Sequence, residues 1–189
     1  MKAPEQIELV RLLKKTYYYF RKKDIKKLRA LSDHVIEDAS IYQEDYIISL
    51  AIILYTLSKI LEKGDYENNP GWNSFYKNSM NNIKKLIYHI TKSKFDDYSD
   101  ILKRLLADIK NLDKEVPMYI EELLNSSRIK KGSSVYSYGI SLGRAAELLG
   151  ISKWELMNYI GNLETTSEYL RKINAIQRYQ TAKKVFNIK

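Results

Sequence analysis

Residues 44–63 read EDYIISLAIILYTLSKILEK and include the most apolar stretch of the chain. Apolar side chains such as Ile47 and Leu54 surround most of the circumference of a helix, and Gly64 follows as a stop signal. The uncharged part, residues 46–58, is shorter than the roughly 20 residues needed to cross a bilayer. The segment therefore predicts a buried helix at the centre of a helical bundle.

Helical periodicity continues on both sides of this segment. Apolar residues recur at intervals of three and four, which is the spacing of one helix face. With only 7 Gly and 3 Pro among 189 residues, there is little material for turns. We find no convincing strand pattern in residues 1–126 and no internal repeat. The sequence predicts an all-α protein with helices over residues 5–20, 24–39, 44–63, 72–92, 95–112 and 117–124.

The positive charge is concentrated in the C-terminal third. The formal net charge is +9, and residues 127–189 contain 11 basic and four acidic residues, against 21 and 19 in residues 1–126. A basic region attached to a near-neutral body favours an anionic polymer as partner. We therefore predict two domains. Residues 1–126 form an N-terminal helical bundle for dimerisation or partner binding, and residues 127–189 form a basic C-terminal region that binds the anionic partner.

Two further segments complete the predicted C-terminal region. Residues 125–140, NSSRIKKGSSVYSYGI, are rich in Ser, Gly and basic residues and predict a linker. Within it, residues 135–138 are interpreted as a short strand or an arm. After Gly161, Thr165 and Glu168 have the spacing of a capping box and predict a last helix that runs to about residue 186.

Residues 141–161, SLGRAAELLGISKWELMNYIG, have the pattern of a helix-turn-helix. Ala145 and Ala146 are small enough for a second helix to cross close by, and Gly150 accepts the positive φ of a tight turn. Ser152 and Glu155 have capping-box spacing at the start of the second helix. The small apolar core is predicted to consist of Leu149, Ile151, Leu156 and Tyr159 or Ile160. The alternative is an ordinary helical hairpin with a glycine turn.

In a helix-turn-helix, the second helix enters the major groove and its N-terminal, outward residues meet the bases. Asn158 has the amide that contacts adenine, and Lys153 has the reach to contact guanine or a phosphate. Trp154 is expected either to contact a thymine methyl group or to pack on the last helix or a protein partner. The predicted base-reading residues are Ser152, Lys153, Trp154, Met157 and Asn158.

Basic residues around the motif are predicted to neutralise phosphates, which positions a protein on DNA without specifying a sequence. A single helix-turn-helix makes few base contacts, so we expect a homodimer on a two-fold operator. The predicted phosphate-binding residues are Arg144, Lys130, Lys131, Arg171 and Lys172, followed by Arg178, Lys183 and Lys184.

The run ISLGRAAELLGISKWELMNYIG resembles a group of small prokaryotic antitoxin-like proteins with a helical motif of the type ISLGKAAELAGISRWEFLELL. The resemblance covers about residues 139–161. It implies a repressor-like protein that binds DNA and has a PIN-domain ribonuclease toxin as a partner. The residues that look alike are Ser141, Leu142, Gly143, Ala145, Ala146, Glu147, Gly150, Ile151, Ser152, Trp154 and Glu155.

Other chemistry finds little support in the sequence. The chain has no Cys, its two histidines lack metal-ligand spacing, and phosphate-loop, dinucleotide and nucleophile-elbow motifs are missing. We expect no catalytic residue, no cofactor and no metal. We also expect no signal peptide or membrane span and a cytoplasmic location. The 16 tyrosines are spread along the chain and are interpreted as residues at the rim of the core.

Two alternative functions remain open. One is a protein–protein adaptor that docks a partner through Trp154 and Met157. The other is an RNA-binding or ribonuclease helical bundle.

Overall fold

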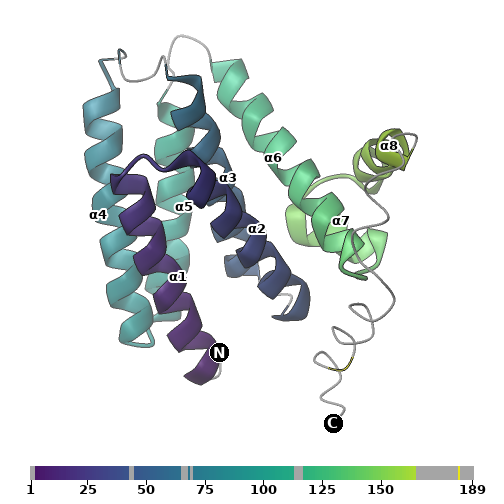
Figure 1. The fold of residues 1–189 in the computed structure, drawn as a ribbon, viewed down its shortest axis with the longest axis horizontal. Coiled ribbons are helices and arrows are strands. Elements are labelled where there is room, and N and C mark those ends of the chain that lie inside the picture. The colour runs from purple at the N-terminus through teal and green to yellow at the C-terminus, as the bar shows by residue number, and fades with distance from the viewer. Residues whose placement is uncertain are drawn as a thin grey trace. The chain divides into compact units, whose positions relative to one another are not determined.

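The computed structural model is built from helices. It describes residues 3–42, 45–64, 68, 70–112, 117–164 and 183, and in this part of the chain it contains no strand. The predicted all-α class is therefore correct. The helices, shown in Figure 1, are α1 (Ala3–Arg21), α2 (Ile25–Tyr42), α3 (Asp45–Lys63), α4 (Trp72–Thr91), α5 (Phe95–Asn111), α6 (Pro117–Ser137), α7 (Leu142–Leu149) and α8 (Lys153–Glu164).

The chain divides into two compact units. The first consists of Met1–Ser32 and Ile53–Leu124, and the second of Asp33–Ile52 and Asn125–Lys189. Helices α2 and α3 therefore each contribute one half to either unit. A single boundary along the sequence, such as the predicted one after residue 126, does not describe this division.

Helix α3 is apolar around its whole circumference, as the sequence predicts. Every side chain from Leu50 to Ser58 is buried. A helix without a polar face lies in the interior of a protein because any exposed face would leave apolar surface in water. Among the described residues, no helix combines the length and the apolar character needed to cross a membrane.

In the first unit, α4 packs against both α1 and α5 (Figure 1). Both α1 and α4 carry buried apolar residues, such as Leu13 and Ile83. The ring centroids of Phe20 and Tyr76 lie 5.1 Å apart at one end. The Tyr76 hydroxyl also donates a hydrogen bond to the Arg21 carbonyl oxygen, at 3.3 Å.

The turns after α1 and α4 have the same backbone geometry. Lys23 and Ser93 both have positive φ, 53° and 57°. The next amide in each turn, of Asp24 or Lys94, donates a hydrogen bond to a helix carbonyl oxygen at 2.9 Å. The buried positions also correspond with an offset of seventy residues: Leu9 with Ser79, Leu13 with Ile83, Thr16 with Leu86, Phe20 with Ile90 and Leu28 with Tyr98.

This likeness was missed in the sequence. Several matched positions carry different residue types, such as Thr16 against Leu86, so the two segments share a burial pattern rather than side chains. Helical hairpins are defined by their turn geometry and buried face, and many residue types satisfy both.

The predicted linker over residues 125–140 is wrong. Helix α6 runs through most of this segment and ends at Ser137, so the predicted strand or arm at residues 135–138 is wrong as well. The buried positions Leu124, Ser127, Lys131 and Val135 recur at intervals of three and four. This is a helix face. Two of its four positions are polar residues, which concealed the period.

Candidate nucleic-acid interface

Helix α7 begins with a side-chain cap. The Ser141 hydroxyl oxygen accepts a hydrogen bond from the Arg144 backbone N–H at 3.2 Å, which satisfies a donor that the first helical turn leaves unpaired. Ala145 and Ala146 are buried, in agreement with the prediction that small residues lie on the inner side of this helix.

The turn between α7 and α8 is built on Gly150. Its φ of 61° and ψ of 38° lie in the left-handed region, which is strained for a residue with a Cβ atom. Its N–H donates to the Glu147 carbonyl oxygen at 3.1 Å, and the N–H of Ile151 donates to that of Ala146, also at 3.1 Å. The predicted glycine turn is confirmed.

Helix α8 begins with the predicted capping box. The Glu155 N–H donates to the Ser152 hydroxyl oxygen, and the Ser152 N–H donates to the Glu155 carboxylate, each at 3.0 Å. Two donors at the helix start are therefore satisfied reciprocally. Hydrogen bonds from the Ser152 side chain and backbone, and a weaker one from the Asn125 side chain, hold the pKa of Glu155 below its usual value.

A close approach to α6 fixes this turn and the start of α8. A Cβ atom added to Gly132 would lie 3.2 Å from the Cδ1 atoms of both Ile151 and Leu156. Leu156 is fully buried, and it faces the same side of α8 as the half-buried Tyr159 and Ile160. Figure 1 shows α7 and α8 beside the C-terminal half of α6.

The packing of Leu156 leaves the opposite side of α8 in solvent. All five predicted base-reading residues are exposed, and Trp154 and Met157 are unusual for apolar side chains, with exposed fractions of 66% and 43%. Lys153 lies over the start of α7, because its Cε atom is 3.9 Å from the place where a Cβ of Gly143 would be. The exposed set, called the α8 face below, consists of Ser152, Lys153, Trp154, Met157 and Asn158.

The predicted phosphate-binding residues differ in their surroundings. Arg144 is partly exposed, and its guanidinium group lies 3.0 Å from the Glu147 carboxylate on the same helix. Lys130 is half-buried. The exposed Arg144–Glu147 ion pair is weak, so Arg144 can exchange Glu147 for a phosphate at little cost in free energy.

Lys131 is the exception among them. Its side chain is 0% exposed, and its ammonium group donates a hydrogen bond to the Asp33 carboxylate at 2.7 Å. A buried ammonium group that already has a carboxylate partner is not available to a phosphate. The prediction that Lys131 contacts DNA is therefore not carried forward. Its place on the buried face of α6 decides its role, and no pattern of charge along the sequence reveals that place.

The remaining predicted phosphate-binding residues lie outside the described part of the chain, apart from Lys183. They include Arg171 and Lys172, which belong to the predicted last helix over residues 165–186. Residues 127–164 contain five basic and three acidic side chains, and residues 165–189 contain six and one. Most of the excess positive charge of this region therefore belongs to its last 25 residues.

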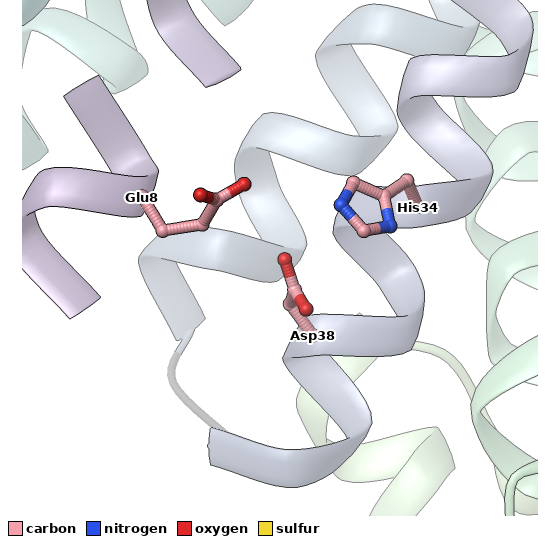
Figure 2. Close-up of side chains that lie close together, drawn as sticks. All are labelled: Glu8, His34 and Asp38. Atoms are coloured by element: carbon pink, nitrogen blue, oxygen red, sulfur yellow. The ribbon is translucent and has the colours of Figure 1, made fainter. Parts of the chain in front are cut away.

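The two histidines lie on different elements. His34 is exposed on α2, and Figure 2 shows it with Asp38, one turn further along that helix. Their ligand atoms lie within 4.8 Å of each other. A tetrahedral zinc site needs four donors, so this pair would leave half of the coordination open. Glu8, also labelled in Figure 2, is on α1 in the first unit. The second histidine, His89 on α4, lies 3.0 Å from the Asp97 carboxylate.

Sequence reasoning missed two residues that position the α8 face. Gly132 permits the close approach of α6, and Asp33 neutralises Lys131. A glycine inside a helix lowers stability by about 0.5–1 kcal/mol relative to alanine. Once the segment is known to be a helix, Gly132 therefore indicates a close contact that a side chain would prevent. Asp33 gave no signal, because it is 98 residues away from its partner.

No protein-family model, curated protein or solved structure matches the chain significantly.

Proposed function

We propose that the protein is a sequence-specific double-stranded DNA-binding regulator in which α7, the Gly150 turn and α8 form a helix-turn-helix. The observation that carries the proposal is the α8 face. Its five side chains are exposed at the N-terminal end of α8, and Trp154 and Asn158 lie on the side opposite to the buried Leu156. This is the part of a recognition helix that meets base edges in the major groove.

The side chains of this face suit base recognition. Asn158 offers a donor and an acceptor for adenine, and Lys153 offers donors for guanine or a phosphate. Trp154 and Met157 supply apolar surface for thymine methyl groups. Arg144 and Lys130 flank the face as phosphate partners, with Arg171 and Lys172 proposed from the sequence alone.

The same proposal includes a homodimer and a toxin partner. Two copies on a two-fold operator double the number of base contacts, which one short helix supplies sparingly. The resemblance to antitoxin-like proteins adds a PIN-domain ribonuclease as a bound protein. Light scattering of the purified chain tests the dimer, and copurification with a coexpressed PIN-domain protein tests the partner.

The test of DNA binding compares a labelled duplex from the protein's own promoter with a random duplex across a salt series. The double variant Lys153→Ala with Asn158→Ala removes two polar contacts of the α8 face. The matched control is Lys77→Ala with Asn78→Ala, which removes the same side chains from an exposed part of α4. We expect preference for the promoter duplex that only the α8 variant loses, with a cost of about 1–3 kcal/mol for a lost base contact.

Other outcomes contradict the proposal in different ways. Salt-sensitive binding without sequence preference, equal in both variants, would reduce the protein to a general polyanion binder. No binding at low salt would remove DNA from the proposal altogether.

The exposure of Trp154 and Met157 favours a second candidate function, a protein–protein adaptor. Large exposed apolar side chains mark interaction surfaces, and tryptophan is prominent among the residues that dominate interface energies. An adaptor predicts partner binding that changes little with salt and is lost in Trp154→Ala. DNA regulation predicts binding that weakens steeply with salt, because phosphate contacts release counterions.

A further inference from the structure

The first unit contains a hollow along α1 that the proposed DNA interface does not use. It is open to solvent and has a volume of about 600 Å³. Pockets of roughly 300–1,000 Å³ accommodate ligands of the size of a small organic molecule. Among the described residues, seven lining residues come from α1 and one comes from the start of α2: Ile7, Val10, Arg11, Lys14, Lys15, Tyr18, Tyr19 and Lys27.

The lining is strongly cationic. Arg11, Lys14, Lys15 and Lys27 contribute four positive charges, and none of the described lining residues is a carboxylate. Two of the cations have acidic neighbours just outside it, Arg11 with Glu8 at 3.6 Å and Lys27 with Asp24 at 3.4 Å. Such exposed pairs are weak. The charge of the hollow therefore favours an anionic ligand with several negative charges close together.

The hollow also offers aromatic surface. The Tyr18 side chain is 55% exposed, and its ring lies edge-on to that of Tyr19, with the centroids 5.8 Å apart. The Lys27 ammonium group lies 5.5 Å from the centroid of the Tyr19 ring. An exposed tyrosine ring stacks well on the base of a nucleotide. Cations clustered beside the ring can then bind the phosphates of the same nucleotide.

Apolar surface lies toward the N-terminal end of the lining, about two to three helical turns before Tyr18. Ile7 is 70% exposed and lies on α1 with Val10, also in the lining. The four cations and the exposed ring of Tyr18 together favour a ligand that has an aromatic group at one end and several negative charges at the other.

We propose that this hollow binds a nucleoside polyphosphate, with the base on Tyr18 and the phosphates at Lys14, Lys15 and Lys27. The ligand is a free nucleotide rather than a nucleic-acid strand because the described residues that line the hollow are confined to α1 and the start of α2. A strand is bound along an extended basic track.

The second helical hairpin supplies matched controls. With the offset of seventy residues, Lys84, Lys85 and Tyr88 of α4 correspond to Lys14, Lys15 and Tyr18, and Tyr88 is also 55% exposed. Asp97 stands where the first hairpin has Lys27. None of these four residues lines the hollow.

The experiment measures binding of the fluorescent nucleotide mant-ATP to the full-length protein by anisotropy, with unlabelled competitors. We expect Tyr18→Ala to weaken binding about tenfold, since stacking on one base contributes about 1–3 kcal/mol. Tyr18→Phe keeps the ring and should retain the affinity, and Tyr88→Ala should leave it unchanged. Lys14→Gln with Lys15→Gln should abolish most binding, whereas Lys84→Gln with Lys85→Gln should not. Circular dichroism of each variant verifies that it is folded.

The competitors decide the ligand class. We expect ATP to displace mant-ATP at lower concentrations than inorganic triphosphate or adenosine, because only ATP combines both groups. Equal competition by triphosphate would overturn the proposal, since the hollow would then bind phosphate without a base. Stronger competition by a single-stranded oligonucleotide would overturn it in favour of a strand. Equal losses in the α1 and α4 variants, or no binding of mant-ATP at all, would overturn it as well.

Discussion

Gly150, before α8, and Gly161, inside α8, have different backbone conformations. Gly150 has a φ of 61° and lies in the turn, whereas Gly161 lies within the helix, and a Cβ atom would meet nothing within 4 Å at either position. Both sites therefore have room for a Cβ atom, and they differ only in backbone conformation. Substitution by alanine isolates this difference.

We expect Gly150→Ala to lower the free energy of unfolding by about 1–2 kcal/mol, because alanine is strained in the left-handed region. Gly161→Ala should raise it by about 0.5–1 kcal/mol, because alanine loses less backbone entropy in a helix. Urea denaturation of both variants measures the two changes. Equal effects at the two glycines would contradict the left-handed turn.

Glu155 links the capping box to pH. Its pKa is lowered in the folded protein by the hydrogen bonds of Ser152, so its carboxylate stabilises the fold above the pKa of the unfolded chain. This contribution is lost as the pH falls through the lower pKa of the folded state.

We expect Glu155→Gln to lose less stability than the native chain between pH 7 and acidic pH, because glutamine does not titrate and still completes a capping box. Urea denaturation across the acidic range provides the comparison. Parallel pH profiles for the two proteins would show that the Glu155 carboxylate makes no such contribution.

At the scale of elements, α6 shows why a helix can be mistaken for a linker. Its Ser and Gly residues have a packing purpose that composition hides: Ser127 is buried, and Gly132 lets Ile151 and Leu156 approach. Helices α1 to α5 were predicted within a few residues because their buried faces are apolar. The buried face of α6 instead includes Lys131. A search for periodic apolar residues does not count a lysine as buried, so it misses this face.

The Lys131–Asp33 pair predicts an asymmetry between its partners. Asp33→Asn removes the carboxylate partner of a buried ammonium group and should cost about 1.5 kcal/mol, the low end of the range for hydrogen bonds to charged groups, because the Asp33 side chain is 61% exposed and water screens the pair. Lys131→Met replaces the cation with an apolar chain of similar length and should change stability by less than about 1 kcal/mol, because it also removes the desolvation penalty. Urea denaturation tests both, and a larger loss for Lys131→Met would contradict the buried pair.

At the scale of the whole molecule, the salt dependence of DNA binding separates interface lysines from structural ones. Each phosphate contact contributes about 0.9 to the slope of log affinity against log salt. We expect Lys153→Ala to reduce that slope by about 1 if Lys153 meets a phosphate, and Lys131→Met to leave it unchanged. Fluorescence titrations with the promoter duplex measure the slopes. A smaller slope in Lys131→Met would return that lysine to the interface.

The sequence by itself determined the all-α class, most helix positions, the Gly150 turn and the Ser152–Glu155 capping box. These features depend on residues within one or two turns of each other, so local periodicity, backbone preference and capping specify them. The tertiary structure alone decided the burial of Lys131, the close approach at Gly132 and the hollow along α1. These depend on which segments pack together, and packing pairs residues such as Asp33 and Lys131 that no local pattern connects.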